Sequence, residues 1–366
     1  MRRGIAELPL HYGSAPKWLF ERQKKLLFEI SRLIIEDFGT EHLLNRISDP
    51  IWFQILGCIS GFDWHSSGVT TTVTAALKES FLQKPEYGVY IFGGKGKSAR
   101  GTPIQIENCR FIDNPQLYIT ISKLTAKVDS NCIQDGYQLY HHTIFVDSKG
   151  NWAVVQQGMN PNNRLARRYH WFNKTTLKDE NNLILEPHTG IASQRKENMV
   201  LNLVDRSCEK LQKDIVEYFI ENTPDSMISE VEKIMKEINK NIEKRIILPQ
   251  RHYIVSSDFD VKRLYKIFCK AKNNDINSFR DLVLTDGVGA KTLRALCLVS
   301  EVVYGNKASL TDPARFSYAF GGKDGHPYPV DRVNYDIVIG ILKDVVDRAK
   351  LGDREKIYAL KKLSEF

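Results

Sequence analysis

The residues best suited to chemistry lie in a short glycine-containing turn in the last third of the chain. Two short predicted helices are joined by Gly287-Val-Gly289, and Lys291 and Thr292 lie on the first turn of the second helix. Glycines let the backbone approach a ligand closely, and the first N–H groups of a helix have no partner within it. Such a turn can bind phosphate, and positive potential at a helix N-terminus favours the neutral, nucleophilic form of an amine.

A carboxylate further along the chain extends this pattern. Asp331 lies in Pro-Val-Asp-Arg, after a glycine-rich loop. The turn, Lys291 and Asp331 together resemble the bifunctional helix-hairpin-helix DNA glycosylases over the C-terminal part of the chain. The resemblance implies that the turn binds backbone phosphate, that Lys291 attacks the anomeric carbon of the sugar, and that Asp331 supports the reaction.

Two features depart from that superfamily. The separation of Lys291 from Asp331 is longer than its usual spacing, and the insertion from Gly321 to Gly325 has no counterpart there. Simpler interpretations therefore stay open. Lys291 could bind phosphate or be solvated, Asp331 could cap the following helix, and the turn could serve helix packing alone.

Two segments in the first half of the chain could contact an anion. One precedes a predicted helix and consists of Asp63, Trp64, His65, Ser66 and Ser67. Hydroxyl groups at the start of a helix bind anions, although they also serve as plain caps.

The other segment is a glycine-rich loop that carries Lys95, Lys97 and Arg100 directly after a predicted strand. It lacks the spacing of a Walker loop, and no helix is expected after it. We interpret it as a phosphate-contacting loop, with a solvated basic turn as the alternative.

Polar residues gather on and near a predicted β-hairpin, whose strands cover 141–146 and 152–156. We expect a polar pocket formed by Asp129, Gln134, Asp135, His141, His142, Gln156 and Gln157. His141 and His142 are catalytic candidates, with structural roles as the alternative. Neighbouring residues on a strand point to opposite faces, so these two cannot chelate one metal ion from the same face.

The best nucleic-acid footprint interleaves basic and aromatic residues just after the hairpin. Arg164, Arg167 and Arg168 could bind phosphate, and Tyr169 and Trp171 could stack on bases. The alternative is an arginine-rich surface helix with buried aromatic side chains.

Motifs in both halves resemble a prokaryotic family defined only as a domain of unknown function. They are Leu8-Pro-Leu-His-Tyr-Gly-Ser-Ala-Pro, Phe62-Asp-Trp-His-Ser-Ser-Gly-Val, Gln134-Asp-Gly-Tyr-Gln-Leu-Tyr-His-His and Gly322-Lys-Asp-Gly-His-Pro-Tyr-Pro-Val-Asp-Arg. The resemblance covers the full length of the chain, and it implies no particular activity.

Hydrophobic periodicity and turn residues predict the elements that must position these groups. Helices are expected over 18–38, from 50 through 56, over 73–81, over 201–247 with a break at 222–226, and through most of 258–366; strands are expected over 89–92 and 118–121 and in the hairpin. The predicted fold class is α+β. An N-terminal α+β domain (1–195) would be followed by a helical connector (196–257) and by an all-helical domain (258–366) with a helix-hairpin-helix element.

Net charge, cysteine spacing and the lengths of apolar runs indicate the kind of partner and the compartment. The formal net charge is +8 and the pI about 9.0, which favours a polyanionic partner such as DNA. The six cysteines contain no CxxC pair, which argues against a zinc ribbon and is typical of buried thiols in a reducing compartment. Neither a signal core nor a run long enough to span a membrane is present. We therefore expect a cytoplasmic protein without membrane attachment.

Three functions fit these patterns. The first is a DNA glycosylase and abasic-site lyase that needs no cofactor, with Lys291, or alternatively Lys95 or Lys127, as the nucleophile. The second is a nuclease that would bind a divalent metal through His65, His141, His142 and either Asp129 or Asp135. The third is a DNA-binding protein without enzymatic activity.

Overall fold

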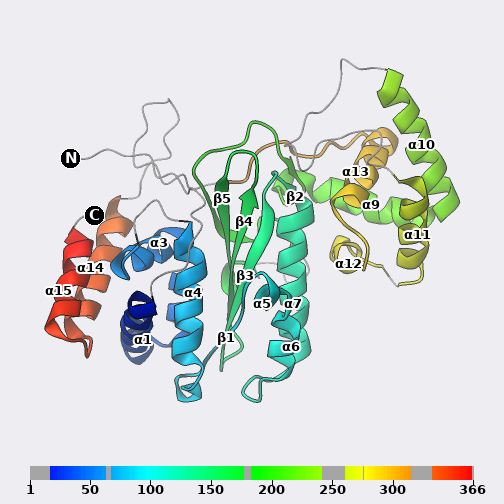
Figure 1. The fold of residues 1–366 in the computed structure, drawn as a ribbon. Helices are drawn as coiled ribbons and strands as arrows, with labels where there is room; N and C mark the ends of the chain where they lie inside the picture. Colours follow the sequence, from blue (N-terminus) through cyan, green and yellow to red (C-terminus); the bar gives the residue numbers. More distant parts are fainter. Residues whose placement is uncertain are drawn as a thin grey trace.

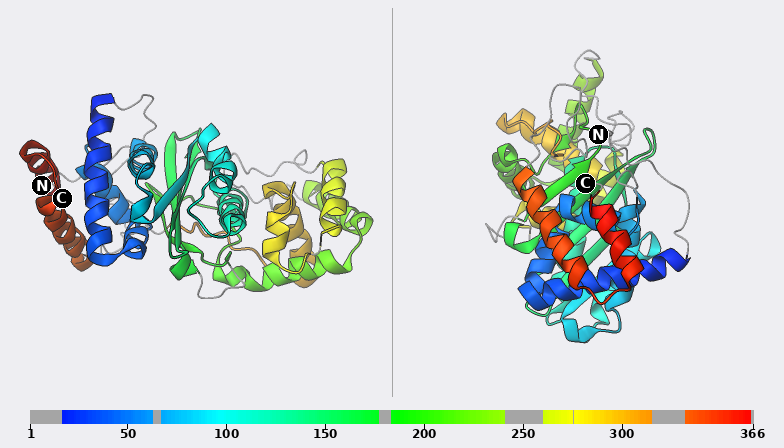
Figure 2. Two further views of the ribbon diagram at one scale, coloured as in Figure 1. Left: turned by 90° about the horizontal axis from the view of Figure 1, so that it is seen from below. Right: turned by 90° about the vertical axis from the view of Figure 1, so that its left-hand side faces the viewer.

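The computed structural model describes residues 17–62, 67–176, 183–240, 260–274, 276–314 and 332–364. A five-stranded antiparallel sheet lies between two groups of helices, and a further helical unit extends from one side (Figure 1). Figure 2 shows these parts following one another along the long axis of the molecule. The mixed α+β class predicted from the sequence is confirmed.

The central sheet has the strand order β1-β3-β4-β5-β6. Its strands are β1 (Val89–Lys95), β3 (Gln138–Asp147), β4 (Trp152–Asn160), β5 (Leu165–Phe172) and β6 (His188–Ser193). The predicted hairpin is confirmed, since β3 and β4 pair in antiparallel fashion. In the turn between them, Asp147 Oδ1 accepts the backbone N–H groups of Lys149 (2.9 Å) and Asn151 (2.8 Å). A second, two-stranded sheet pairs β2 (Ile133–Gln134) with β7 (Leu201–Asn202).

Four helices cover one face of the sheet: α1 (Lys17–Phe38), α2 (Thr40–Ile47), α3 (Pro50–Ile59) and α4 (Gly68–Phe81). The sequence signals for their ends are confirmed. The chain leaves α1 at Gly39, whose φ of 90° suits glycine, and the Asp49 side chain accepts the N–H groups of Ile51 and Trp52 to cap α3. These helices bury a continuous apolar cluster against Val89, Ile91, Phe145 and Val155 of the sheet, among others.

The last two helices return to this same helical layer. α14 (Arg332–Arg348) packs against α1, and α15 (Asp353–Ser364) packs against α3. Leu342, Val345 and Val346 join the cluster formed by α1 to α4, and Arg348 pairs with Asp37 of α1. The predicted single domain over 258–366 is therefore wrong, since its C-terminal helices pack with the N-terminal ones.

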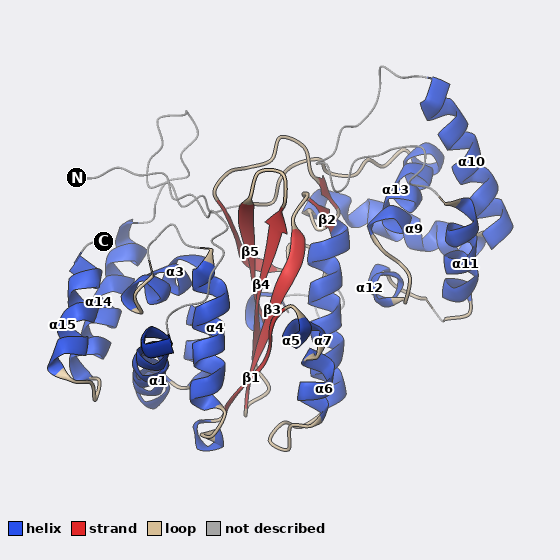
Figure 3. Cartoon of the chain, in the orientation of Figure 1, coloured by secondary structure: helices blue, strands red, loops and turns tan. Residues whose placement is uncertain are grey.

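The opposite face of the sheet is covered by α7 (Pro115–Lys127), which lies beside α6 (Thr102–Glu107) (Figure 3). The strand predicted over 118–121 is wrong, because those residues lie inside α7. Asn114 caps this helix before Pro115, and the residues that it buries recur at helical spacing, as Tyr118, Ile121, Ser122 and Thr125 do. α7 continues into one turn of π-helix, Val128–Cys132. Shorter helices are α5 (Lys97–Arg100), α8 (Asn173–Thr176) and the 3₁₀ turns Pro85–Tyr87 and Arg206–Cys208.

The helical unit at the far side of α7 contains α9 (Glu209–Glu221), α10 (Pro224–Lys240), α11 (Val261–Lys272), α12 (Phe279–Leu284) and α13 (Ala290–Tyr304). The predicted helix break at 222–226 is confirmed, but the predicted helix from 201 is wrong at its start, where β7 and a 3₁₀ turn come first. In this unit α12 packs on α7, and α13 packs on the π-helical turn. The helical unit therefore contacts the rest of the protein through the helix that covers the sheet.

The packing of α14 against the N-terminal helices predicts a local effect on stability. Leu342 is fully buried, so Leu342→Ala should lower the free energy of unfolding by about 2–4 kcal/mol. Ile357→Ala is the control, because Ile357 is 64% exposed and should change stability by less than about 0.5 kcal/mol. Urea denaturation followed by circular dichroism measures both, and equal costs would contradict this packing.

Candidate functional site

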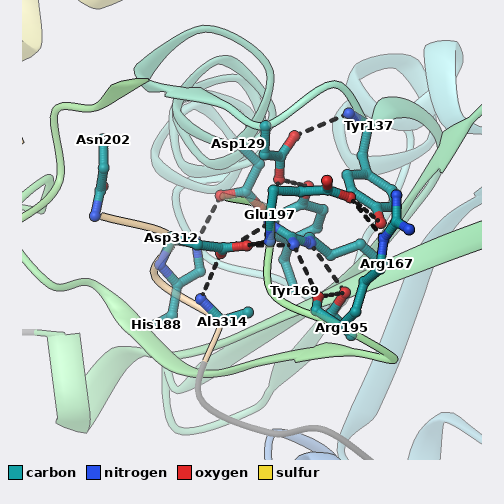
Figure 4. Close-up of polar contacts among 12 residues, drawn as sticks. Asp129, Tyr137, Arg167, Tyr169, His188, Arg195, Glu197, Asn202, Asp312 and Ala314 are labelled. Carbon is teal, nitrogen blue, oxygen red and sulfur yellow. Dashed lines mark hydrogen bonds and ion pairs between the residues drawn. The ribbon is translucent and has the colours of Figure 1, made fainter. Parts of the chain in front are cut away.

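A buried carboxylate, Asp129, organises a polar cluster at one end of the sheet. Its Oδ1 lies 2.6 Å from Nε2 of His188, and its Oδ2 accepts from Nε2 of Gln156 (2.5 Å) and Nε1 of Trp171 (3.0 Å). Asp129 is fully buried, and the side chain of His188 is 7% exposed. The three donors hold the carboxylate in one orientation. Figure 4 shows Asp129 and His188 among the polar contacts of this region.

Two local irregularities of the backbone bring this pair together. Asp129 lies on the π-helical turn that ends α7, and π-helical turns occur frequently at functional sites. His188 opens β6, and the shift in register between His170 and Trp171 places Trp171 opposite His188. The ring of Trp171 meets the imidazole of His188 edge to face, with centroids 4.5 Å apart.

His188 also lines a pocket of about 200 Å³. The pocket walls combine polar and apolar residues: Glu186, His188, Gly190, Ile191, Lys196, Asn202, Val204, Asp205, Thr311, Asp312, Pro313 and Ala314. Asp129 takes the hydrogen bond of Nε2, and within the described residues no group bonds to Nδ1 of His188. An imidazole that is oriented by a carboxylate and lines a pocket can accept or return a proton.

A second buried group, the guanidinium of Arg167, closes the cluster. Arg167 pairs with Asp135 at 3.0 Å and with Asp312 at 2.7 Å, and Tyr169 donates to the same oxygen of Asp135 at 2.6 Å. Burial raises the pKa of Asp135 to about 6, although Arg167 opposes the shift. Breaking a buried pair of this kind by removing one partner typically costs 3–5 kcal/mol, so we infer that Arg167 is structural.

The predicted DNA contacts of four residues on β5 are wrong. Arg167, Arg168, Tyr169 and Trp171 are each at most 1% exposed, so they present no surface to phosphate or base. Arg168 instead donates to His170 Nε2 (2.8 Å) and to Gln54 Oε1 (3.1 Å). The segment is a strand, and not the alternative surface helix, although its aromatic residues are buried as that alternative supposed. Arg164 is exposed.

The sheet divides the predicted polar pocket into two networks. On one face, His142 bonds to Ser122 (2.8 Å) and Gln156 (2.8 Å), next to Asp129. On the other face, His141 bonds to Thr74 (3.0 Å) and Thr143 (2.9 Å). Burial lowers the pKa of both histidines, that of His141 to about 3.

The remaining pocket candidates are divided in the same way. Gln157 lies on the His141 face, where it bonds to Thr70, to Tyr140 and to the carbonyl of Ser67. Asp135 belongs to the Arg167 cluster, and Gln134 bonds to α13. Among the described residues, no group of three or more His, Cys, Asp or Glu is placed to hold a metal ion.

His188 and Asp312 were missed by sequence reasoning. Neither lies in a recognisable motif, and they are far apart in the chain. His188 follows Glu186-Pro187 at the start of β6, and its position beside Asp129 depends on an irregularity in the pairing of β5 with β6. No local sequence signal could have shown that His188 contacts Asp129 or that Asp312 contacts Arg167.

The glycine turn joins α12 to α13 as the sequence predicts, and side chains from the sheet unit hold it. Lys127 donates to the carbonyls of Val283 (2.9 Å), Leu284 (3.1 Å) and Thr285 (2.7 Å), which caps the C-terminus of α12. Lys127 is therefore engaged in structure, and burial lowers its pKa. Gly287 has a φ of 91°, a conformation that favours glycine.

Gln134 fixes the start of α13. Its Nε2 donates to the carbonyl of Ala290 (2.9 Å), and its Oε1 accepts from Nε of Arg294 (3.0 Å). The adjacent Lys291 side chain is exposed, Gly289 is half-buried, and Thr292 is only 3% exposed. Of the predicted phosphate ligands, Gly287 and Lys291 are therefore at the surface.

Two further lysines lie near Lys127, which holds this turn. Lys123 and Lys270 are exposed and act electrostatically on Lys127, and Lys270 also pairs with Asp286 at 3.4 Å. Lys95, Lys97 and Arg100 are also exposed, and the last two lie on the short helix α5, where no helix was expected. Asp63, Trp64, His65, Ser66 and Asp331 lie outside the described residues.

The buried His141 predicts a loss of stability in acid. Its pKa is about 3 in the fold and 6.5 when unperturbed, so the unfolded chain binds the proton more tightly. The contribution of His141 to the free energy of unfolding is therefore complete above pH 6.5, and it falls by up to about 1.4 kcal/mol per pH unit below pH 6.5. His141→Gln should reduce the stability lost between pH 7 and pH 5 by about 2 kcal/mol, as measured by urea denaturation. An unchanged loss in the variant would contradict this assignment.

Comparison with known proteins places the chain in a family. No curated protein and no solved structure matches it. None of the helices in the described part of the chain is long and apolar enough to cross a membrane. One family model, described as a protein of unknown function (DUF763), matches residues 4–330. Because this match covers most of the chain, the protein belongs to the DUF763 family.

Proposed function

We propose that this protein binds DNA and acts on damaged sites as a DNA glycosylase and abasic-site lyase, with Lys291 as the nucleophile. The observation that carries the proposal is the position of Lys291. It is exposed on the first turn of α13, directly after the Gly287 turn, and exposed Lys123 and Lys270 lie close to the same turn. We interpret α12, the turn and α13 as a helix-hairpin-helix element.

Phosphate binding fits the chemistry of this surface. The N-terminus of a 15-residue helix carries positive potential, and the neighbouring lysines add formal charge. A net charge of +8 supports a polyanionic partner, and the exposed Lys95, Lys97 and Arg100 provide a second basic surface. Asp286 lies at the turn, but Lys270 pairs with it.

The lyase reaction requires an accessible amine next to a bound sugar. At an abasic site the lone pair of Lys291 Nζ would attack C1′ of the ring-opened sugar, and loss of water would give a Schiff base. Removal of a C2′ proton then expels the 3′ phosphate with its electron pair, which cleaves the strand. In the glycosylase step the same attack would displace the damaged base. Asp331 would assist proton transfer in this proposal.

Reductive trapping tests the nucleophile. Borohydride should link the wild-type protein covalently to abasic DNA, because it reduces the Schiff base to a stable amine. Lys291→Ala should reduce the adduct at least about a hundredfold, which corresponds to loss of the covalent step. Lys262→Ala is the matched control, since Lys262 is exposed on α11, and it should retain the adduct. No adduct with wild-type protein would reject the lyase, and an adduct in Lys291→Ala would place the nucleophile elsewhere.

The His188–Asp129 pair favours a second candidate, a DNA hydrolase. Here Nδ1 of His188 would take a proton from water, and the water oxygen would bond to phosphorus while a sugar oxygen leaves. His188 thereby replaces His141 and His142, which lie on opposite faces and are engaged in hydrogen bonds. This second candidate is thus the nuclease alternative with His188 as its general base.

Cleavage of DNA without a trapped adduct would favour this hydrolase. In that case His188→Gln should slow cleavage by about a hundredfold or more, whereas Lys291→Ala should not. A chelator included in the same assay would show whether a divalent metal takes part. Equal cleavage by wild type and His188→Gln would reject the role of His188.

A further inference from the structure

The strand β1 lies at the edge of the sheet, and its outward backbone groups are hydrogen-bonded at one residue and unpaired at another. At Gly93 the backbone N–H donates to Gln105 Oε1 (2.9 Å), and the carbonyl accepts from Lys78 Nζ (2.7 Å). Both groups of Gly93 therefore point away from β3, the only strand paired with β1 in the described sheet. Side chains thus close the edge at this residue.

The adjacent part of β1 lacks this protection. Backbone groups alternate in direction along an antiparallel strand, so the N–H and C=O groups of Val89 and Ile91 point outward as those of Gly93 do. Nothing in the described part of the chain bonds to these outward groups of Ile91. An unpaired edge of this kind is a template for another strand.

A groove of about 530 Å³ runs along this open edge. One wall is the end of α4 with Phe81 and Leu82, and the other is the segment that follows α6, with Phe111. Leu82 is 72% exposed and Phe111 is 57% exposed, and the Phe111 ring stacks on Tyr90 with centroids 5.8 Å apart. Both walls therefore offer apolar surface to side chains of an added strand.

The charges of the groove have one sign. Its lining contains two charged residues, Lys78 and Arg110, and both are basic. No carboxylate among the described residues pairs with either of them. Arg110 is exposed, and burial lowers the pKa of Lys78. Charge complementarity therefore favours an acidic occupant.

We propose that the β1 groove binds an extended, acidic and apolar peptide segment of another protein, which adds to the sheet as a sixth strand. The segment would pair with Val89 and Ile91, and Gln105 would stop it at Gly93, so that about four of its residues extend the sheet. Alternate side chains would contact the α4 wall and the Phe111 wall. This binding does not depend on the function proposed for Lys291.

Selection from random heptapeptides displayed on phage, with the full chain as bait, tests the proposal. Selected peptides should alternate apolar residues and carry acidic residues. As synthetic peptides, they should bind Leu82→Asp, Arg110→Glu and Ile91→Pro at least about tenfold more weakly than wild type. Proline at 91 removes an outward N–H, which edge strands tolerate, and it also removes the buried Ile91 side chain, so this variant is compared at a temperature where its melting curve shows it folded. Ile104→Asp and Lys149→Glu are controls, because both residues are exposed and lie outside the groove lining.

Several results would overturn the proposal. Selected peptides that are basic, that bind the three groove variants as tightly as wild type, or that fail to emerge at all would each do so. A dimer in solution that dissociates in Leu82→Asp would show that a second copy of this chain occupies the groove. Melting curves for every variant establish that the fold is kept.

Discussion

The buried guanidinium of Arg167 is the interaction on which the polar end of the molecule depends. All five of its N–H groups are used, since Nε donates to Ser193 and the other donors bond to Asp135, to both oxygens of Asp312 and to the carbonyl of Arg195. Three distant segments thereby meet at one cation. Because Asp312 also accepts the N–H groups of Glu197 and Ala314, this cation fixes the wall of the His188 pocket.

The sheet separates two sets of functional groups that the sequence places side by side. Successive residues of β3 and β4 point to opposite faces, so His142 and Gln156 join Asp129 while His141 and Gln157 join α4 and Tyr140. Only the first network leads to the pocket, through His188. The small sheet β2–β7 connects this region with the Lys291 turn, because Asn202 lines the pocket and Gln134 holds α13.

Much of the fold could be predicted where the signals are local. The α1 helix, the Asp49-Pro50 start of α3, the β3–β4 hairpin and the two helices around Gly287 follow from caps, turn residues and periodicity. The prediction failed at 118–121, where four residues of strand type lie in a helix that begins at Asn114-Pro115. It also failed at β5, since an Arg-rich strand resembles a nucleic-acid surface until its ion-pair partners are known.

The sequence by itself determined the mixed class, the ends of α1, the start of α3, the β3–β4 hairpin, the basic charge and the lysine that follows a glycine turn. These properties depend on residues close together in the chain, whose steric and hydrogen-bonding preferences act locally. Tertiary structure alone decided that α14 and α15 pack with α1 and α3, that Arg167 is buried, and that His188 meets Asp129. Each of these contacts joins residues far apart in sequence, so it depends on sheet register and on burial that no local pattern specifies.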